Sequence, residues 1–259
     1  MNDYKSIFDM TGQVALIIGG AGGLGRDMAL ALSQYGADIA IAQRKPEKGN
    51  DLKEIVTKTT GRRCELYKVD VLEENSVKLL VDKIDADFGR LDILINSAGL
   101  NVLQKAEEYS AENWDTVLDL NLKGTYLACR EAARIMIRQK KGKIINLSSV
   151  RGNLGMPEGY IAYCASKGGI NMLTKCLASE WAKYNISVNA IAPTFIRTDI
   201  NEKQLADEKF YNTLVARIPM KRIGVQQDIV GPTLLFASGA ADFITGQVLL
   251  VDGGITSTQ

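Results

Sequence analysis

Short apolar stretches alternate along this chain with longer segments in which apolar residues recur every three or four positions. The apolar stretches carry few charges, as is typical of strands that are buried on both faces of a parallel sheet. The longer segments have helical periodicity, which is clearest in "NSVKLLVDKIDADFG" at 75–89. Regular alternation of strands and helices predicts a parallel sheet with helices on both faces. We expect seven strands, at residues 13–18, 37–42, 64–70, 91–96, 142–149, 186–193 and 246–254.

The whole chain, residues 1–259, is expected to form a single domain. No Pro- or Ser-rich linker, low-complexity run or internal repeat divides its 259 residues, and 46% of them are hydrophobic, which is enough for one continuous core. The sequence therefore predicts a single-domain, doubly wound α/β fold of the Rossmann type.

Charge and cysteine usage exclude several classes of function. The 31 Lys and Arg residues nearly balance the 30 Asp and Glu residues, so neither a nucleic-acid partner nor a membrane-surface partner is indicated. The N-terminus "MNDYKSIFDM" lacks the apolar core of a signal peptide, and no apolar run approaches the length of about 18 residues that indicates a membrane span. Cys64, Cys129, Cys164 and Cys176 form no CxxC pair, and histidine is absent, so no zinc site of the usual kind is expected. These features favour a cytoplasmic protein with reduced thiols.

A glycine-rich turn follows the first expected strand. "IIGGAGGLGRDMA" places Gly19, Gly23 and Gly25 between a strand and a helix that is expected to begin near Arg26. Glycines let the backbone turn sharply and approach a pyrophosphate, which the free N–H groups of a helix N-terminus then bind. The turn predicts a dinucleotide site, with a merely tight strand–helix turn as the alternative.

The stretch "AYCASKGG" places Tyr163 four residues before Lys167, on one face of a helix. A free tyrosine has a pKa near 10 and is a poor base at neutral pH, but a neighbouring ammonium favours the phenolate and lowers that pKa. We therefore expect Tyr163 to be the acid/base group of a protein without histidine, with Lys167 lowering its pKa. The alternative is a helix pair on the surface.

Together these motifs identify a family. The glycine spacing matches the GxxxGxG of the short-chain dehydrogenases/reductases, and the chain resembles them from about Thr11 to Gly254. Ile18, Ser97 and Thr194 depart from the Thr, Asn and Gly that are usual in the family. The motifs that carry the resemblance, in chain order, are "GGAGGLG" at 19–25, "NSAG" at 96–99, Asn121, Ser149, Tyr163 with Lys167, "IAPTFIRT" at 191–198 and "VDGG" at 251–254.

The resemblance implies a catalytic tetrad of Asn121, Ser149, Tyr163 and Lys167. In the family, Tyr163 would exchange a proton with the substrate oxygen as hydride is transferred, and Ser149 would hydrogen-bond that oxygen. Lys167 would also hold the nicotinamide ribose, and Asn121 would hold a water that links the lysine to solvent. The chain is thus expected to be an NAD(P)-dependent oxidoreductase acting on secondary alcohols or ketones.

The cofactor is expected to be NADP(H) rather than NAD(H), although NAD or dual use stays open. A carboxylate about 20 residues past the glycines would favour NAD. Asp38 comes too early for this, and Arg44 stands at the end of the second strand, where it could bind a 2′-phosphate. The residues that the motifs and the resemblance place at the cofactor are Gly19, Gly23, Leu24, Gly25, Arg44, Asp70, Val71, Asn96, Ala98, Gly99, Tyr163, Lys167, Pro193, Ile196 and Thr198.

The substrate is expected to be a small polyhydroxy compound such as a sugar acid. Segments such as "AGLN" and "RIPMKRIG" resemble the family branch that includes gluconate 5-dehydrogenases. The polar segment at about 199–219 is expected to be a mobile substrate lid. Arg151 could clamp a carboxylate, with an exposed or structurally paired arginine as the alternative. Further candidates for contact with substrate hydroxyls are Asn101, Asn153, Glu158 and Tyr160.

Other functions remain open at this point. They are a 3-oxoacyl-type or other carbonyl reductase, a non-catalytic regulator that senses NADP, and a structural subunit of a larger complex. The resemblance also implies a homotetramer or homodimer, with the last strand and the long helices near Asn121 and Tyr163 in the interfaces.

Overall fold

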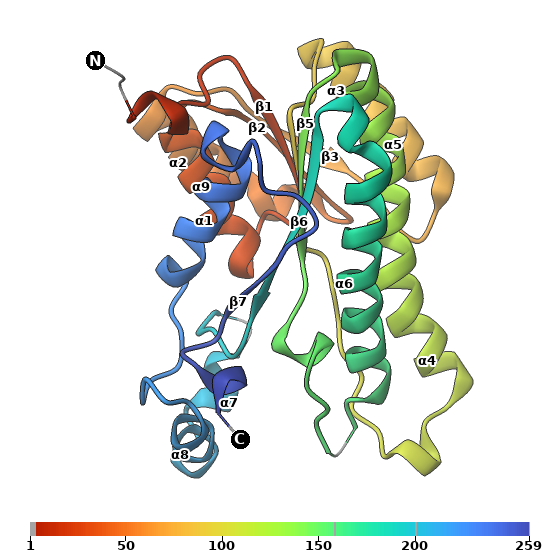
Figure 1. Cartoon of the computed structure of the whole chain (residues 1–259), viewed down its shortest axis with the longest axis vertical. Helices are drawn as coiled ribbons and strands as arrows, with labels where there is room; N and C mark the ends of the chain where they lie inside the picture. The colour runs from red at the N-terminus through yellow and green to blue at the C-terminus, as the bar shows by residue number, and fades with distance from the viewer. Residues whose placement is uncertain (1–3, 158, 200, 259) are drawn as a thin grey trace.

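A seven-stranded parallel sheet forms the centre of the computed structural model, which describes residues 4–157, 159–199 and 201–258 (Figure 1). The strand order is β3-β2-β1-β4-β5-β6-β7, so the predicted strand number and parallel arrangement are confirmed. Most strands are a few residues shorter than expected. Their bounds are β1 Val14–Ile18, β2 Asp38–Gln43, β3 Cys64–Lys68, β4 Ile93–Asn96, β5 Gly142–Leu147, β6 Ile186–Pro193 and β7 Val248–Val251.

Helices cover both faces of this sheet. In Figure 1, α1, α2 and α9 lie on one side of the strands, and α3, α5 and α6 lie on the other. Successive side chains of β1 therefore enter different cores. Ala15 and Ile17 pack into the core under α1, α2 and α9, whereas Leu16 and Ile18 pack into the core under α3, α5 and α6. The helices are α1 Gly23–Gln34, α2 Asn50–Thr60, α3 Glu74–Phe88, α4 Ala111–Leu118, α5 Gly124–Gln139, α6 Ile161–Trp181, α7 Glu202–Leu205, α8 Glu208–Arg217 and α9 Gln227–Ala237.

The order of the strands reverses at β1, which pairs with β2 on one side and with β4 on the other. In open parallel sheets, ligands bind beyond the carboxyl ends of the strands at such a reversal point. The topology therefore directs a ligand to the loops that follow β1 and β4.

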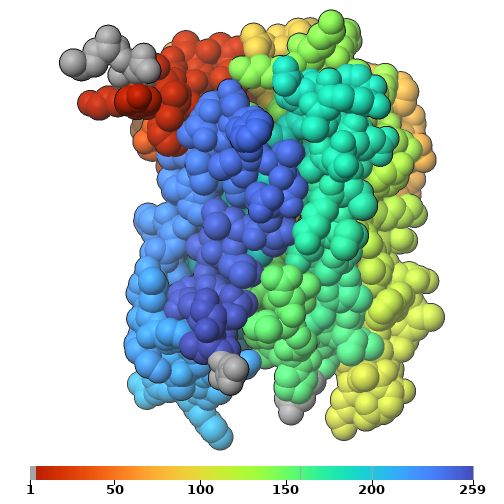
Figure 2. Space-filling view, viewed as in Figure 1, coloured from red at the N-terminus to blue at the C-terminus, as the bar shows by residue number. Residues whose placement is uncertain are grey.

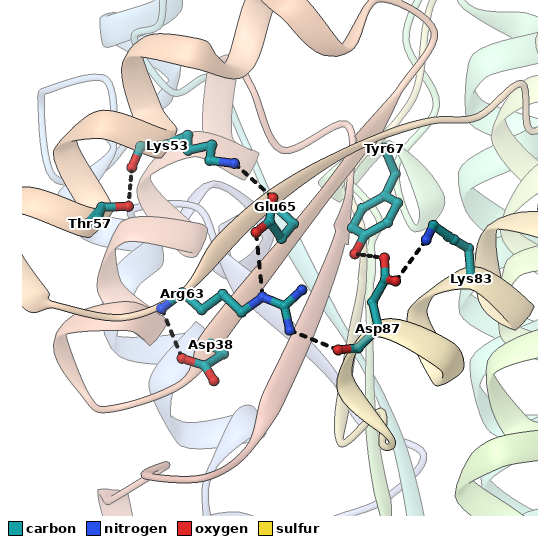
Figure 3. Close-up of polar contacts among 8 residues, drawn as sticks. All are labelled: Asp38, Lys53, Thr57, Arg63, Glu65, Tyr67, Lys83 and Asp87. Carbon is teal, nitrogen blue, oxygen red and sulfur yellow. Dashed lines mark hydrogen bonds and ion pairs between the residues drawn. The ribbon is translucent and has the colours of Figure 1, made fainter.

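A network of charged side chains holds the outer strand β3 (Figure 3). The backbone N–H of Arg63 donates to Asp38 Oδ1 at 3.0 Å, and the guanidinium donates to the carbonyl oxygen of Asp87 at 2.7 Å. Lys53 and Arg63 both pair with Glu65. Asp38 begins β2 and therefore lies at the opposite end of this strand from Arg44. This position agrees with the expectation that Asp38 does not bind the cofactor ribose.

The polar segment at 199–219, which the sequence analysis expects to form a lid, follows β6 and contains α7 and α8. Its apolar residues Leu205, Leu214 and Ile218 are buried in a small cluster of their own, together with Ile223. None of the helices in the described residues has the length and hydropathy needed to cross a membrane.

Candidate active site

A cleft of about 900 Å³ opens where the carboxyl ends of β1, β4, β5 and β6 meet. It brings together most of the residues that the sequence predicts to bind the cofactor, to act in catalysis or to bind the substrate. The nominated residues that line it are Gly19, Gly23, Leu24, Arg44, Asp70, Val71, Ala98, Gly99, Asn101, Ser149, Arg151, Tyr160, Tyr163, Lys167, Pro193, Ile196 and Thr198.

At Gly19 and Gly25, the glycine turn after β1 has room for backbone only. A Cβ on Gly19, whose φ is +82°, would lie 2.9 Å from the backbone nitrogen of Ala98. A Cβ on Gly25 would lie 2.5 Å from the carbonyl oxygen of Gly19, so Gly25 packs behind the turn and does not line the cleft. The turn leads directly into α1, whose first N–H groups have no partner within the helix. This arrangement fits the diphosphate of a dinucleotide.

Arg44 is the cationic side chain of the cleft wall after β2. It is exposed, and no acidic side chain of the described residues forms an ion pair with it. The neighbouring Gln43 donates to the carbonyl oxygen of Lys45 at 2.6 Å. The wall at this position therefore offers a positive charge and no carboxylate, which fits a phosphate on the adenosine ribose.

Tyr163 and Lys167 lie on one face of α6 and point to the same part of the cleft, as their spacing predicts. Lys167 Nζ lies 5.5 Å from the centre of the Tyr163 ring and donates to the carbonyl oxygen of Leu147 at 2.7 Å. Burial lowers the pKa of Lys167 from 10.5 to about 8, because no carboxylate of the described residues offsets the loss of solvent around its ammonium.

The expectation that Lys167 lowers the pKa of Tyr163 is wrong for this structure. Burial raises the pKa of Tyr163, while a hydrogen bond with Ser149 and the charge of Arg151 lower it by less. The physical reason is that losing water around the phenolate costs more than these neighbours return. At neutral pH the phenol is thus protonated and ready to donate.

Ser149 lies two residues after the end of β5, beside this tyrosine. Its hydroxyl donates to the carbonyl oxygen of Pro193 at 3.4 Å and accepts the backbone N–H of Arg151 at 3.2 Å. The preceding Ser148 donates to Asn171 Oδ1 of α6 at 2.6 Å. Ser148 thus connects β5 to the helix, whereas Ser149 faces the reacting centre.

Asn121 lies behind the cleft wall rather than in it. It is fully buried on a π-helical turn between α4 and α5, where Nδ2 donates to the Leu100 carbonyl at 2.9 Å and to Ser166 Oγ at 3.0 Å. Ser166 in turn donates to the carbonyl oxygen of Tyr163 at 2.7 Å. Asn121 therefore connects the loop after β4 to the turn of α6 that carries the tyrosine. Short π-helical turns of this kind are common at functional sites.

Two other residues that the sequence analysis predicted to contact cofactor or substrate do not line the cleft, and a third lies outside the described residues. Asn96 is buried and donates to Asn146 Oδ1 at 2.9 Å, so it joins β4 to β5. Asn153 accepts from Asn171 Nδ2 at 2.9 Å. Glu158 lies outside the described residues.

The cleft also contains residues that sequence reasoning did not nominate individually. Asn201 and Gln204 belong to the segment expected to form a lid, which was the available signal for them. Phe195 lies within the motif at 191–198, whereas Leu103 carried no signal, because a single apolar residue in a loop does not indicate where its side chain lies.

The chain is similar over nearly its whole length to known dehydrogenases and reductases. The family model described as "Enoyl-(Acyl carrier protein) reductase" matches residues 19–256. The gluconate 5-dehydrogenase of Gluconobacter oxydans is 34% identical over 253 residues, covering 98% of each chain. The NAD-dependent glycerol dehydrogenase of Listeria innocua is 36% identical over 253 residues, covering 98% of this chain and 97% of that one. A crystal structure of a gluconate 5-dehydrogenase from Burkholderia cenocepacia, in complex with NADP and tartrate, is 34% identical, with a TM-score of 0.92 over 98% of this chain and 99% of that one.

Proposed function

Because the chain belongs to the short-chain dehydrogenase/reductase family, we propose that it is an NADP-preferring oxidoreductase that interconverts a secondary alcohol and a ketone in a small polyhydroxy acid. The observation that carries this proposal is the meeting of Ser149, Tyr163 and Lys167 at one part of the cleft, next to the glycine turn. When bound in this cleft, a nicotinamide cofactor would supply or accept the hydride.

The side chains then divide the remaining work. The protonated Tyr163 donates its proton to the carbonyl oxygen in the reductive direction, and its raised pKa keeps that proton in place at neutral pH. Ser149 hydrogen-bonds the same oxygen and disperses the charge that develops on it. Lys167 contributes positive charge beside the tyrosine and would donate to the ribose of a bound cofactor, while Asn121 positions the turn of α6 through Ser166. In oxidation the same groups act in reverse, and Tyr163 must then be deprotonated.

The preference for NADP is supported by Arg44 and by the absence of a carboxylate from the described cleft wall after β2. The relatives differ on this point: the Burkholderia enzyme was solved with NADP, whereas the Listeria enzyme is named NAD-dependent. The local chemistry favours the phosphorylated cofactor, because a guanidinium forms charge-assisted hydrogen bonds with a phosphate.

The substrate class is supported by the polar groups of the cleft, which include Asn101, Tyr160 and Gln204. A long acyl chain would leave such groups without hydrogen bonds, so the alternative of a 3-oxoacyl reductase is not favoured. The gluconate 5-dehydrogenase relatives point to the same class. We also infer that α7 and α8 form a lid over the substrate, since Asn201 and Gln204 reach the cleft from this segment.

For the assembly we propose a homotetramer or homodimer in the cytoplasm. Apolar side chains are exposed on the helices α4, α5 and α6, namely Trp114, Tyr126 and Met172, and on the last strand Leu249 is partly exposed. Figure 2 shows the C-terminal segment that contains β7 beside the surface of α6. Light scattering on the purified protein tests this proposal, and a monomer at micromolar concentration would contradict it.

The activity is tested by following NADPH formation from NADP⁺ with D-gluconate and other small polyhydroxy acids. We expect turnover with at least one acid and a lower kcat/KM with NAD⁺. A protein that binds NADPH but turns over none of these acids, and no simple ketone in the reverse direction, would instead support a cofactor-sensing regulator.

A further inference from the structure

Arg151 is a buried cation that has no anionic partner among the described residues. It lies on the short turn Val150–Gly152 directly after Ser149, and only 7% of the residue is exposed. Its guanidinium makes one hydrogen bond, from Nη1 to the carbonyl oxygen of Gly155 at 3.3 Å. No carboxylate of the described residues lies within ion-pair distance of it. Burial lowers the pKa of Arg151, which shows that the charged form is poorly compensated.

A second arginine adds to this positive charge. Arg217 ends α8 of the proposed lid, and its charge lowers the pKa of Arg151 further. Arg217 likewise has no ion-pair partner among the residues that the structure describes. Two like charges close together destabilise the protein unless an anion binds near them. Since Arg151 lines the cleft, that anion can come from the substrate.

An unsatisfied acceptor lies in the same cleft. Asn101 Oδ1 is buried and has no hydrogen-bond donor among the described residues, although Asn101 lines the cleft. A ligand hydroxyl cannot reach this oxygen while the side chain keeps its position, because the atom itself is buried. Recognition of an anion in the cleft therefore rests on the guanidinium of Arg151.

We propose that Arg151 binds the carboxylate of the substrate, so that the enzyme selects a polyhydroxy acid over the corresponding neutral polyol. This inference rests on the proposed function, because it assigns a specificity-determining residue to the same site. It goes further in naming the group that is recognised and the side chain that recognises it.

The test compares D-gluconate with D-glucitol, which differ only in a carboxylate or a hydroxymethyl group at C1. For the variant Arg151→Gln, kcat/KM with D-gluconate should fall by about 10- to 100-fold, the loss expected for a hydrogen-bonded charge pair. The value with D-glucitol should fall at least about tenfold less, because the neutral polyol loses only the effect of the Arg151 charge on Tyr163. Arg151→Lys should restore part of the loss. A control variant is Arg138→Gln, which removes an exposed ion pair between Arg138 of α5 and Asp85 of α3 and should change neither value.

A structural role for Arg151 predicts a different pattern. It would lower the melting temperature of Arg151→Gln and reduce activity with both substrates equally, and that result overturns the proposal. Our account expects a melting temperature that is unchanged or higher, because the variant removes an uncompensated buried charge.

A binding measurement separates this inference from the proposed function. D-gluconate and D-glucitol are titrated into the complex of enzyme and NADPH, which cannot turn them over, and the nicotinamide fluorescence is followed. Gluconate should bind at least about tenfold more weakly to Arg151→Gln than to the wild type. If Arg151→Gln binds gluconate more weakly but the wild type turns over none of the acids, the proposed function fails and the inference stands. Turnover with an unchanged preference for gluconate in the variant would overturn the inference alone.

Discussion

The β3 edge and the cleft use charged side chains in opposite ways. At the edge, each cation drawn in Figure 3 has an acidic partner: Lys53 and Arg63 pair with Glu65, and Lys83 pairs with Asp87. In the cleft, the cations Arg44, Arg151 and Lys167 have no acidic partner among the described residues. A charge that the protein neutralises itself serves the fold. A charge that is left uncompensated in a concave site marks the place where a ligand supplies the opposite charge.

Two tyrosines repeat this contrast. Burial raises the pKa of both Tyr67 and Tyr163. Tyr67 donates to Asp87 Oδ2 at 2.9 Å, and this carboxylate raises its pKa further, which fixes the proton in a structural hydrogen bond. Tyr163 instead faces Ser149 and the charge of Arg151, both of which stabilise the phenolate. The neighbours of Tyr163 thus allow it to release and regain a proton.

The largest expected effect separates these two tyrosines. Tyr163→Phe should lower kcat by about 10²- to 10⁴-fold, the usual contribution of a positioned acid or base, and should leave the Kd for NADPH within a few-fold. Tyr67→Phe is the matched control: it should keep its activity and lose about 1 kcal/mol of unfolding free energy with its hydrogen bond. Initial rates, fluorescence titration and urea unfolding provide the values. Undiminished turnover by Tyr163→Phe would refute its role.

A second comparison uses two buried lysines. Because the folded state lowers the pKa of Lys167 to about 8, the ammonium form costs stability at neutral pH, and the cost declines as pH rises from about 8 towards 10.5. Lys167→Met should therefore be more stable than the wild type at pH 7, by roughly 2 kcal/mol after the lost hydrogen bond is counted. This advantage should shrink towards pH 10.

Lys143 is the matched control for this experiment. It is equally buried but pairs with Asp242 at 2.7 Å, so Lys143→Met removes a compensated charge and should not show the gain in stability that is expected of Lys167→Met at pH 7. Urea unfolding of both variants and of the wild type, at pH 7 and at pH 9.5, gives the free energies of unfolding to be compared. A gap between Lys167→Met and the wild type that does not depend on pH would show that Lys167 is not an uncompensated charge.

The smallest effect concerns the β3 edge. The hydrogen bond and charge of Lys53, together with those of Arg63, lower the pKa of Glu65. The carboxylate thus contributes stability above its unfolded pKa, and this contribution is lost as pH falls through the lowered value. Glu65→Gln should cost about 0.5 kcal/mol at pH 7, since the pairs are partly exposed, and less at pH 3. Thermal unfolding at both pH values measures the difference, and an equal cost at pH 3 would contradict the pairing.

Much of the site could be predicted because its signals are local in sequence. The glycine turn, the pair Tyr163 and Lys167, and Arg44 at the end of β2 each follow from spacing or from the end of a strand. The raised pKa of Tyr163 could not be predicted, since it depends on how tightly the completed fold excludes water. The isolation of Asn101 Oδ1 is also a property of tertiary packing, because it depends on which donors fail to reach that atom.

The lid segment shows a further limit of sequence reasoning. The polar composition of 199–219 led to the expectation of a lid but did not indicate its helices, in which Leu205 and Leu214 are buried together with Ile218. A few apolar residues in a polar segment are a weak periodic signal, and their burial depends on Ile223 and Phe195 outside the segment.

The most direct test of the contrast between compensated and uncompensated charges is the NADPH affinity of Arg44→Gln beside that of Arg63→Gln. NADPH is titrated into each variant and into the wild type, and the nicotinamide fluorescence is followed. Our account predicts that Arg44→Gln binds NADPH at least about tenfold more weakly, a loss of about 1.4 kcal/mol, while its NADH affinity and its unfolding free energy are unchanged. Arg63→Gln should keep the NADPH affinity of the wild type. Unchanged NADPH binding by Arg44→Gln would contradict the account.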